Sequence, residues 1–461
     1  MSEAADAKNT SNILGAPKKA LIAMVIPILI GMLVQSLNNF IDAIWVSGIG
    51  TGALAATGVV FPFFFILIGI GNGLGVGASQ AIARRIALGD RDGANKAASH
   101  VLVIGVIVGF VITAIFALFA EPIFMVAGAG DYIAETMAYG LPVMLCSPIY
   151  MLSFIFSAIM RSEGAAKMSM NIQIVGVVVH MVLDPILIYG LGIGIEGAAL
   201  ASAISMVAAV IVAVYVYERT DRMYIRLSFH GFRFDGALDR DILRVGIPAS
   251  LEMIFVSISS MIMNIIIVSV DPVNGVAIYT TGWRILDLLM LPATSFGSAL
   301  VPISAAGFGC GLYEKVRDVY RYAIMYGEAI MIALMVITLV CAPYIVTLFT
   351  YTGTSASLAE PMTEFVRIGC IFLPFTVLGV VTSSLFQSVG QGLKSMVATA
   401  FRNLLRVPIC FTLAPMMSLT LLWWGLTAAE FIGGTLIAIW GIFLLRSLKK
   451  SLVPQCPAPA E

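Results

Sequence analysis

The segment ALAATGVVFPFFFILIGIGNGLGVGASQAI, residues 53–82, carries no charged side chain along its whole length. An α-helix rises about 1.5 Å per residue, so this segment exceeds the roughly 30 Å hydrocarbon layer of a bilayer. Glycine occupies every second position from Gly69 to Gly77 and therefore recurs at i, i+4, a spacing typical of membrane helices that approach each other closely. No strand precedes the glycine run, so it does not predict a phosphate-binding loop. The segment predicts a membrane-spanning helix.

The composition of the whole chain agrees with this interpretation. Of 461 residues 60% are hydrophobic and 11% are charged, the mean hydropathy is +1.00 and the net charge is zero. These values exclude a soluble globular protein. The basic residues form small clusters between apolar segments, so we expect no nucleic-acid partner. The polar N-terminus is followed by a long span and not by a short apolar segment with a cleavage site, so we expect no removable signal peptide.

Six cysteines are scattered singly, without the paired spacing of a zinc site or a disulfide framework. We expect them to be small apolar core residues. They are Cys146, Cys310, Cys341, Cys370, Cys410 and Cys456.

The fold class that we predict is an all-α integral membrane protein with twelve transmembrane helices. Charged or Gly/Pro-rich loops divide the apolar segments from one another. The predicted spans lie near residues 20–46, 53–82, 98–120, 133–160, 168–190, 195–217, 245–270, 275–305, 320–348, 365–388, 397–420 and 423–446.

The distribution of Lys and Arg gives the chain a direction. The N-terminus, the even-numbered loops and the C-terminal tail hold nearly all of the 26 basic residues. Because positive charge accumulates on the cytoplasmic side, we expect a multi-pass protein of the plasma membrane with both termini in the cytoplasm. Arg284 is the only basic residue that this division places well inside a span.

The chain also repeats itself. Ile26-Pro27 recurs as Ile247-Pro248, and three further short matches follow in the same order at offsets of 222 to 228 residues. We therefore expect two pseudo-symmetric six-helix bundles related by an axis along the membrane normal. The expected parts are a cytoplasmic N-terminal tail (1–17), an N-lobe (18–217), a cytoplasmic linker (218–244), a C-lobe (245–447) and a cytoplasmic C-terminal tail (448–461).

Charged residues inside spans are few, and they mark candidate functional sites. Asp42 and Asp184 lie at similar depth in the outer half of the first and fifth spans, and Ser202 reaches that depth in the sixth. His180 precedes Asp184 by one helical turn, so both side chains lie on one helix face. We expect these four residues to share one cavity.

Two neighbouring carboxylates cannot both stay charged without a cation. This cluster should therefore share a proton, or bind a hard ion such as Na⁺ with Ser202 and nearby carbonyl oxygens as further ligands. Pro27 and Pro185 each remove a helix hydrogen bond, so they mark places where the helices can bend. The alternative interpretation is an interfacial Asp42 and an ordinary core histidine at 180.

The second half does not repeat these acids. The positions equivalent to Asp42 are Met263 or Asn264, and the position equivalent to Asp184 falls near Thr412. We therefore expect any coupling ion in the first half only. Arg284 and Asp287 are expected to form an internal ion pair, because they lie three residues apart on a helix. Glu252 has no partner in the sequence pattern. We assign Glu252, Arg284 and Asp287 to a candidate substrate cleft.

The chain resembles the multidrug and toxic compound extrusion (MATE) family, with DinF-like members as the nearest branch. The resemblance rests on Pro27, Gln35 and Asp42 in the first span, the segment 75–90 after it, and Leu183-Asp184-Pro185 in the fifth. It implies a V-shaped pair of bundles that exports cationic amphiphiles in exchange for H⁺ or Na⁺, without a cofactor. It also implies a coupling site at Asp42 and Asp184, with Gln35, Asn38 and Asn39 as supporting cavity residues.

Departures from the family pattern bear on the coupling ion. His180 stands where related sequences have Asn, Asn38 where they have Tyr, and Ser202 where they have Thr. Histidine titrates near neutral pH, so H⁺ and Na⁺ remain equal alternatives.

Two rival functions remain in view. They are a lipid or lipid-linked oligosaccharide flippase of the same superfamily and a membrane enzyme. The first tends to have further helices or a basic cleft, and the second needs a metal cluster or a nucleophile with its base. We expect no enzyme activity. We expect a monomer whose partners are small-molecule drugs or toxic metabolites and the lipid bilayer.

Overall fold

The computed structural model describes residues 10–456 except 349 and 351–355, and all regular secondary structure in these residues is helical. The first half of the chain forms α2 (Pro17–Ser47), α3 (Thr51–Ala87), α4 (Arg91–Val126), η1 (Gly130–Tyr132), α5 (Ile133–Leu145), α6 (Ser147–Ser162), α7 (Ala166–Pro185), η2 (Ile186–Gly190) and α8 (Ile195–Arg219). The second half forms α9 (Gly236–Val270), α10 (Gly275–Gly309), α11 (Tyr313–Thr347), η3 (Ala356–Leu358), α12 (Ala359–Cys370), α13 (Leu373–Ser388), α14 (Gly392–Leu413), η4 (Ala414–Met416) and α15 (Leu419–Ser451).

The described residues contain ten helices that are long and apolar enough to cross a bilayer, together with two bent helix pairs. The pairs are α5 with α6, bent by 51°, and α12 with α13, bent by 49°. If each pair is one span, the total is the predicted twelve. The sequence predicted each pair as one continuous helix. Pro148 and Pro374 stand in the first turns of α6 and α13. A residue in the first turn has no intrahelical partner for its N–H, so proline begins a helix there without losing a hydrogen bond.

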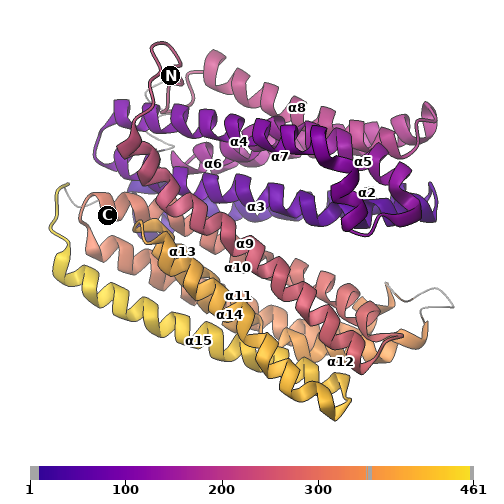
Figure 1. Ribbon diagram of the computed structural model, residues 1–461. Helices are drawn as coiled ribbons and strands as arrows, with labels where there is room; N and C mark the ends of the chain where they lie inside the picture. Colours follow the sequence, from indigo (N-terminus) through magenta and orange to yellow (C-terminus); the bar gives the residue numbers. More distant parts are fainter. Residues whose placement is uncertain (1–9, 349, 351–355, 457–461) are drawn as a thin grey trace.

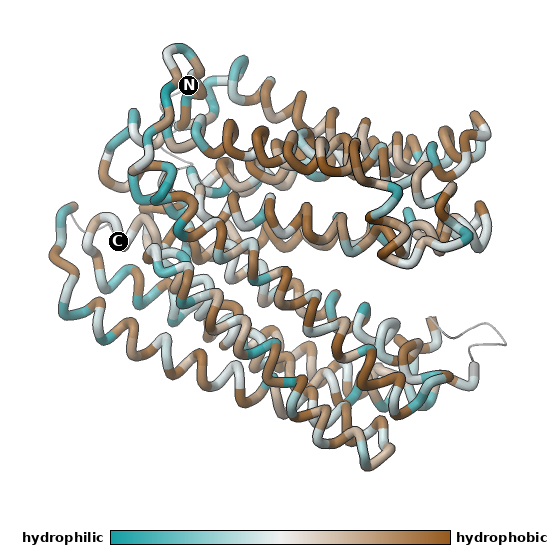
Figure 2. The backbone as a smooth tube through the Cα atoms, viewed as in Figure 1, coloured by the Kyte–Doolittle hydropathy of each residue, from teal (hydrophilic) through white to brown (hydrophobic). Residues whose placement is uncertain are grey.

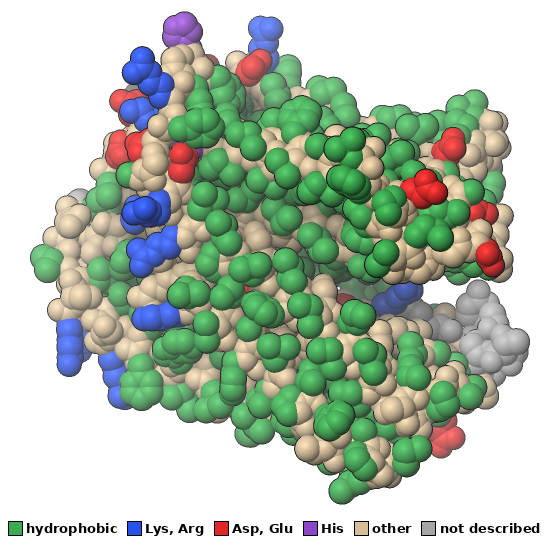
Figure 3. Space-filling view, in the orientation of Figure 1, with side chains coloured by type: hydrophobic (Ala, Val, Ile, Leu, Met, Phe, Trp, Pro, Cys, Tyr) green, Lys and Arg blue, Asp and Glu red, His purple; other side chains and the backbone are tan. Residues whose placement is uncertain are grey.

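The two halves of the chain form two helix bundles. Figure 1 shows α2 to α8 in one bundle and α9 to α15 in the other, close together near both chain ends and diverging toward the opposite end. We call the first the termini end. The helices are largely apolar along their length, as Figure 2 shows. Lys and Arg side chains gather at the termini end, and the surface is hollowed between the bundles at the opposite end (Figure 3). This is the V shape that the resemblance predicted.

The glycine run of α3 packs on two sides. A Cβ atom on Gly73 would lie 2.7 Å from Ser250 Cα, and one on Gly69 would lie 2.9 Å from Met253 Cβ, both on α9 of the other bundle. A Cβ atom on Gly75 would lie 2.7 Å from Ala158 Cβ on α6. The glycines therefore allow close backbone packing both between the bundles and within one of them, as their spacing predicted.

Ion pairs also join the bundles at the termini end. Arg84 and Arg85 of α3 lie 2.6 and 3.2 Å from Asp241 Oδ2 of α9. His100 Nδ1 of α4 lies 2.8 Å from Asp239 Oδ1, which also belongs to α9. These contacts hold α9 against two helices of the first bundle.

Helix α9 begins at Gly236, earlier than the predicted start at 245, so the segment between the bundles covers residues 220–235. Asp235 explains the earlier start, because its carboxylate accepts hydrogen bonds from the backbone N–H groups of Ala237 and Leu238. These bonds stabilise the charged form and lower the pKa of Asp235.

Two cysteines contradict the prediction that all six are unpaired. Cys310, which follows α10, forms a disulfide with Cys456 in the C-terminal tail. The tail reaches it by folding back, and Gln455 N donates a hydrogen bond of 2.8 Å to Cys310 O. Both sulfur atoms also lie close to the carbonyl oxygen of Ala87 at the end of α3, at 3.2 and 3.6 Å. The separation of 146 residues hid this pair from analysis of local spacing.

Candidate ion-binding site

Helices α2, α7 and α8 bring the four predicted residues of the first half together. One ligand atom from each of Asp42, His180 and Asp184 lies within 4.8 Å of the other two. Ser202 Oγ of α8 lies 2.8 Å from His180 Nε2. The depth argument from the sequence is thus matched by the geometry. We call these four residues the carboxylate cluster.

His180 lies at the centre of the cluster. Its Nδ1 atom is 3.1 Å from Asn38 Oδ1 and 3.3 Å from Asp184 Oδ2. Because both neighbours of Nδ1 are acceptor oxygens, the Nδ1 proton is retained, and it is donated to Asn38 Oδ1, while Asp184 Oδ2 lies within ion-pair distance but accepts no hydrogen bond. In the neutral imidazole, Nε2 then accepts a hydrogen bond from the Ser202 hydroxyl. The histidine therefore uses two oxygen atoms, of Asn38 and Ser202, that would otherwise be free to bind an ion.

The two acids have unused oxygen atoms. Asp42 Oδ1 and both carboxylate oxygens of Asp184 are buried and have no hydrogen-bond partner among the described residues. The side chain of Asp184 is only 1% exposed. A buried carboxylate without hydrogen bonds is costly unless it binds a proton or a cation. The cluster is therefore suited to bind and release a small positive ion.

Two tyrosines that the sequence analysis did not identify lie beside the carboxylate cluster. Tyr139 of α5 lies within electrostatic reach of both acids, and Tyr150 of α6 lies close to Ser202 and within reach of Asp42. Tyr139 precedes the bend between α5 and α6 at Cys146, and Tyr150 follows it. The proline at 148 was the available signal for that bend.

The supporting residues divide into two groups. Asn38 is buried and contacts His180, as expected of a cavity residue. Gln35 and Asn39 bond each other instead, at 3.3 Å, and none of the hydrogen bonds of the described residues joins them to the cluster.

The two predicted bending positions also differ. Helix α2 continues through Pro27, whereas α7 ends at Pro185 and is followed by a π-helical turn, Ile186–Gly190.

The second bundle holds a different polar site around Glu252. Its Oε1 atom accepts hydrogen bonds from Ser395 Oγ at 2.6 Å and Gln387 Nε2 at 3.2 Å, and its Oε2 atom accepts one from Thr399 Oγ1 at 3.2 Å. Three helices, α9, α13 and α14, thus meet at this half-buried carboxylate.

The expected ion pair between Arg284 and Asp287 is wrong. Both side chains are exposed, and the ion pairs of the described residues do not include one between them. Asp287 lies instead within electrostatic reach of Arg406 and interacts with Trp283. Spacing along the helix permitted the pair, but solvent access removed the reason to form it.

Two further basic residues lie within a span, which corrects the prediction that Arg284 alone does. Arg402 of α14 lies 3.0 Å from Glu430 Oε2 of α15. Arg406 is 1% exposed, and its Nε atom donates to Ser259 Oγ at 2.6 Å and Asn403 O at 3.1 Å. The predicted span 397–420 already contained both residues, so the prediction that Arg284 alone lies well inside a span did not follow from the predicted boundaries.

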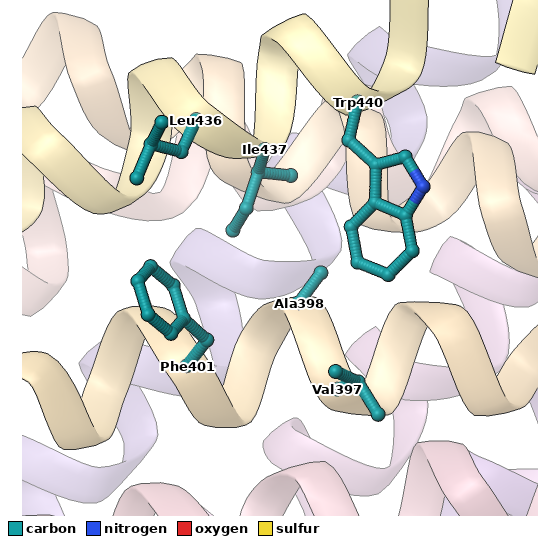
Figure 4. Close-up of a pocket in the computed structure, with 6 residues that line it drawn as sticks. All are labelled: Val397, Ala398, Phe401, Leu436, Ile437 and Trp440. Carbon is teal, nitrogen blue, oxygen red and sulfur yellow. The ribbon is translucent and has the colours of Figure 1, made fainter. Parts of the chain in front are cut away.

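An apolar groove on the second bundle has a different character. Val397, Ala398 and Phe401 of α14 face Leu436, Ile437 and Trp440 of α15 across it, as Figure 4 shows. Its lining offers no acid or base, so it is not a second ion site.

Two bundles of spanning helices, hollowed between them and carrying a buried cluster of ionisable residues, define a membrane transporter. The MatE family model matches the chain twice, over residues 27–186 and 248–412. The chain belongs to the MATE family of transporters. The two matches begin at Pro27 and Pro248, the same pair that opened the internal repeat.

Named relatives and solved structures agree with this family. The chain is 25% identical to the multidrug export protein MepA of Staphylococcus aureus over 431 residues, 93% of this chain and 94% of that protein. A MATE family transporter of the MOP superfamily in its outward-facing conformation is 34% identical, with a TM-score of 0.93, over 96% of this chain and 99% of that one. A MOP superfamily transporter from Pyrococcus furiosus, whose binding pocket is described as having reversed polarity, is 33% identical with the same TM-score and coverage.

Proposed function

We propose that this chain is a secondary active exporter of cationic and amphiphilic small molecules in the plasma membrane. The relatives named for multidrug export support this function, whereas none of those reported above is named as a flippase. The surplus of Lys and Arg at the termini end supports a cytoplasmic position for both chain ends. The hollow between the bundles then opens to the outside, and the ion pairs of Asp241 and the hydrogen bond between His100 and Asp239 close the cytoplasmic side.

The carboxylate cluster is the coupling site in this proposal. The observation that carries it is the set of buried oxygen atoms on Asp42 and Asp184 that lack a hydrogen-bond partner. Binding of an ion from outside would stabilise one arrangement of α2, α7 and α8, and its release to the cytoplasm would stabilise the other. Pro27 and the π-helical turn after Pro185 supply places where α2 and α7 can bend.

We propose H⁺ as the coupling ion. Asn38 and Ser202 supply neutral side-chain oxygens beside the two acids, and both contact the imidazole of His180. A protonated imidazole beside the two acids would also repel Na⁺. Two carboxylates and a histidine can instead share and pass protons, which requires no shell of oxygen ligands.

The substrate would enter the hollow between the bundles. Glu252 and the exposed Asp287 supply negative charge on the second bundle, which suits organic cations. Arg284 is also exposed and would favour amphiphiles with a polar, acceptor-bearing end. This part of the proposal assigns a substrate class and not a particular compound.

The test is efflux of ethidium from proteoliposomes under a proton gradient and, separately, under a Na⁺ gradient. We expect the wild type to respond to the proton gradient alone. His180→Asn would restore an amide oxygen at the centre of the cluster, and we expect it to gain a response to Na⁺. Efflux without any gradient, or a wild type driven only by Na⁺, would contradict the proposed coupling. Empty liposomes measure passive leakage of the dye.

A further inference from the structure

A groove on the outer surface of the second bundle differs in one respect from the apolar groove of Figure 4. It lies between α11 and α15, has a volume of about 440 Å³ and is floored by Leu378 of α13. Its apolar walls include Met325, Ala438 and Ile442, but two arginines, Arg317 and Arg321, stand at one end. The groove is therefore apolar along its length and basic at one end.

The position of the groove fits one leaflet of the membrane. Helix α11 begins at Tyr313 and α15 ends at Ser451, so the basic end of the groove lies near the termini end of both helices. From Arg317 to Met325 the groove runs about 12 Å along α11 at the usual helical rise. This length spans a headgroup region and the first part of an acyl chain.

The two arginines differ in how they are paired. Arg317 forms ion pairs with Glu314 and Asp318. Arg321 is exposed, and none of the ion pairs or hydrogen bonds of the described residues involves it. A guanidinium at the membrane interface binds phosphate well, because its planar donors match two phosphate oxygens at once.

The walls of the groove face lipid. Met325 and Ile442 are 46% and 47% exposed, and neighbouring large apolar side chains such as Phe443 are exposed as well. Behind the groove, the Tyr320 hydroxyl is already bonded to Thr382 Oγ1 at 2.8 Å, so the back wall offers no competing polar group. An occupant must therefore be apolar over most of its length and anionic at one end.

We propose that this groove binds one anionic phospholipid, with its phosphate on Arg321 and an acyl chain along Met325, Leu378 and Ile442. Each Lys or Arg near a membrane surface contributes about 1 kcal/mol to the binding of anionic lipid. The apolar groove between α14 and α15 provides an internal contrast, because it should accept acyl chains without preference for a headgroup. The lipid site does not depend on the transport function proposed above.

The test measures lipids retained by the purified full-length protein in native mass spectrometry. The protein is incubated with phosphatidylglycerol or phosphatidylcholine of identical acyl chains. We expect the wild type to prefer phosphatidylglycerol by about fivefold, and Arg321→Gln to remove that preference. Arg233→Gln, which changes an exposed arginine in the segment between the bundles, should leave it unchanged.

A second variant tests the apolar part of the groove. Ala438→Phe places a ring in the groove, and we expect it to reduce retention of both lipids while the protein still elutes as one species. Ala438→Leu is the smaller change for use if the phenylalanine variant aggregates.

Three outcomes would overturn the proposal. They are equal retention of both lipids by the wild type, an unchanged preference in Arg321→Gln, and displacement of phosphatidylglycerol by inorganic phosphate alone. The last would show that the arginine binds a free anion and not a lipid.

Discussion

The two bundles place different side chains at equivalent positions. His180 and Arg406 each lie fourteen residues after the first residue of α7 and α14, and Asn38 and Ser259 each lie eleven residues after Pro27 and Pro248. In the first bundle the imidazole contacts the amide of Asn38, and in the second the guanidinium contacts the hydroxyl of Ser259. The same pair of helices is thus joined in the same place by different chemistry.

The difference separates a changeable charge from a fixed one. Histidine gains and loses its proton near neutral pH, whereas arginine stays charged. The first bundle adds Asp42 and Asp184, and the second has Met263 or Asn264 in place of Asp42. Counted from the first residues of α7 and α14, the position equivalent to Asp184 is Cys410, two residues before the predicted Thr412. The second bundle therefore carries a permanent positive charge, the guanidinium of Arg406, at the place where the first bundle has acids that can bind an exchangeable cation. If the carboxylate cluster is the coupling site as proposed, this contrast would allow one fold, used twice, to respond to an ion in the first bundle only.

The largest expected effect comes from the acids of the first bundle. Asp184→Asn keeps the shape of the side chain but removes its charge, so we expect gradient-driven efflux to fall by roughly tenfold or more. Cys410→Ala, at the equivalent position of the second bundle, should change efflux by less than about twofold. Initial rates from proteoliposomes give both values. Equal losses of efflux in the two variants would contradict the proposed functional difference between the bundles.

A second variant makes the first bundle resemble the other. His180→Arg places a permanent cation beside Asp42 and Asp184, so the acids stay neutralised at every pH. We expect efflux to become insensitive to the proton gradient and to fall on the order of fivefold. His230→Arg, an exposed change in the segment between the bundles, is the matched control. Persistence of the response to pH in His180→Arg would contradict the assigned role of the histidine.

The fixed cation of the second bundle should matter for stability and not for coupling. Arg406→Gln removes a charged donor from Ser259 and Asn403, and we expect the free energy of unfolding to fall by about 2 kcal/mol. Thermal unfolding of the purified protein measures this, with the exposed Arg240→Gln for comparison. The choice of coupling ion should be unchanged. A new response to Na⁺ in Arg406→Gln would show that this site also takes part in coupling.

The smallest effect concerns how each bundle begins. Asp235 caps α9, whereas α2 starts after Ala16 without a side-chain cap. Asp235→Ala should lower the unfolding temperature slightly, and Asp235→Asn should restore most of the loss. Because the folded-state pKa of Asp235 lies below its ordinary value, its charged form stabilises the fold at neutral pH and loses that contribution as the pH falls below 3.8. A difference between wild type and Asp235→Ala that grew in acid would contradict this account.

The sequence was sufficient for the features that depend on long apolar stretches. Hydropathy and the basic loops predicted twelve spans, and matching depths in three helices predicted that Asp42, Asp184 and Ser202 would meet. His180 followed from helical periodicity alone. In a membrane these signals are strong, because a charge inside a span is costly and is seldom placed there without a partner.

Other features depend on contacts that no local pattern reports. The apolar stretch 133–160 predicted one continuous helix, and although Pro148 was a signal for the bend, no local pattern related Tyr139 and Tyr150 to the carboxylate cluster. Arg406 was counted with the basic residues outside the spans although it lies nine residues inside the predicted span 397–420, and its hydrogen bonds to Ser259 and Asn403 depend on contacts between helices. The expected pair of Arg284 and Asp287 failed for the opposite reason, since helical spacing permits a contact but does not require it.

The path of the C-terminal tail has a practical consequence for reporter design. A disulfide between Cys456 and Cys310 bonds the tail to the second bundle, and both of its sulfur atoms lie close to the carbonyl oxygen of Ala87 in the first bundle. A fluorescent protein fused directly after Cys456 would therefore start beside the contact between the bundles at the termini end, which would separate in the proposed transport cycle. A partner dye on the segment between the bundles would convert that movement into a change in energy transfer, and reducing agent would show whether the disulfide limits its range.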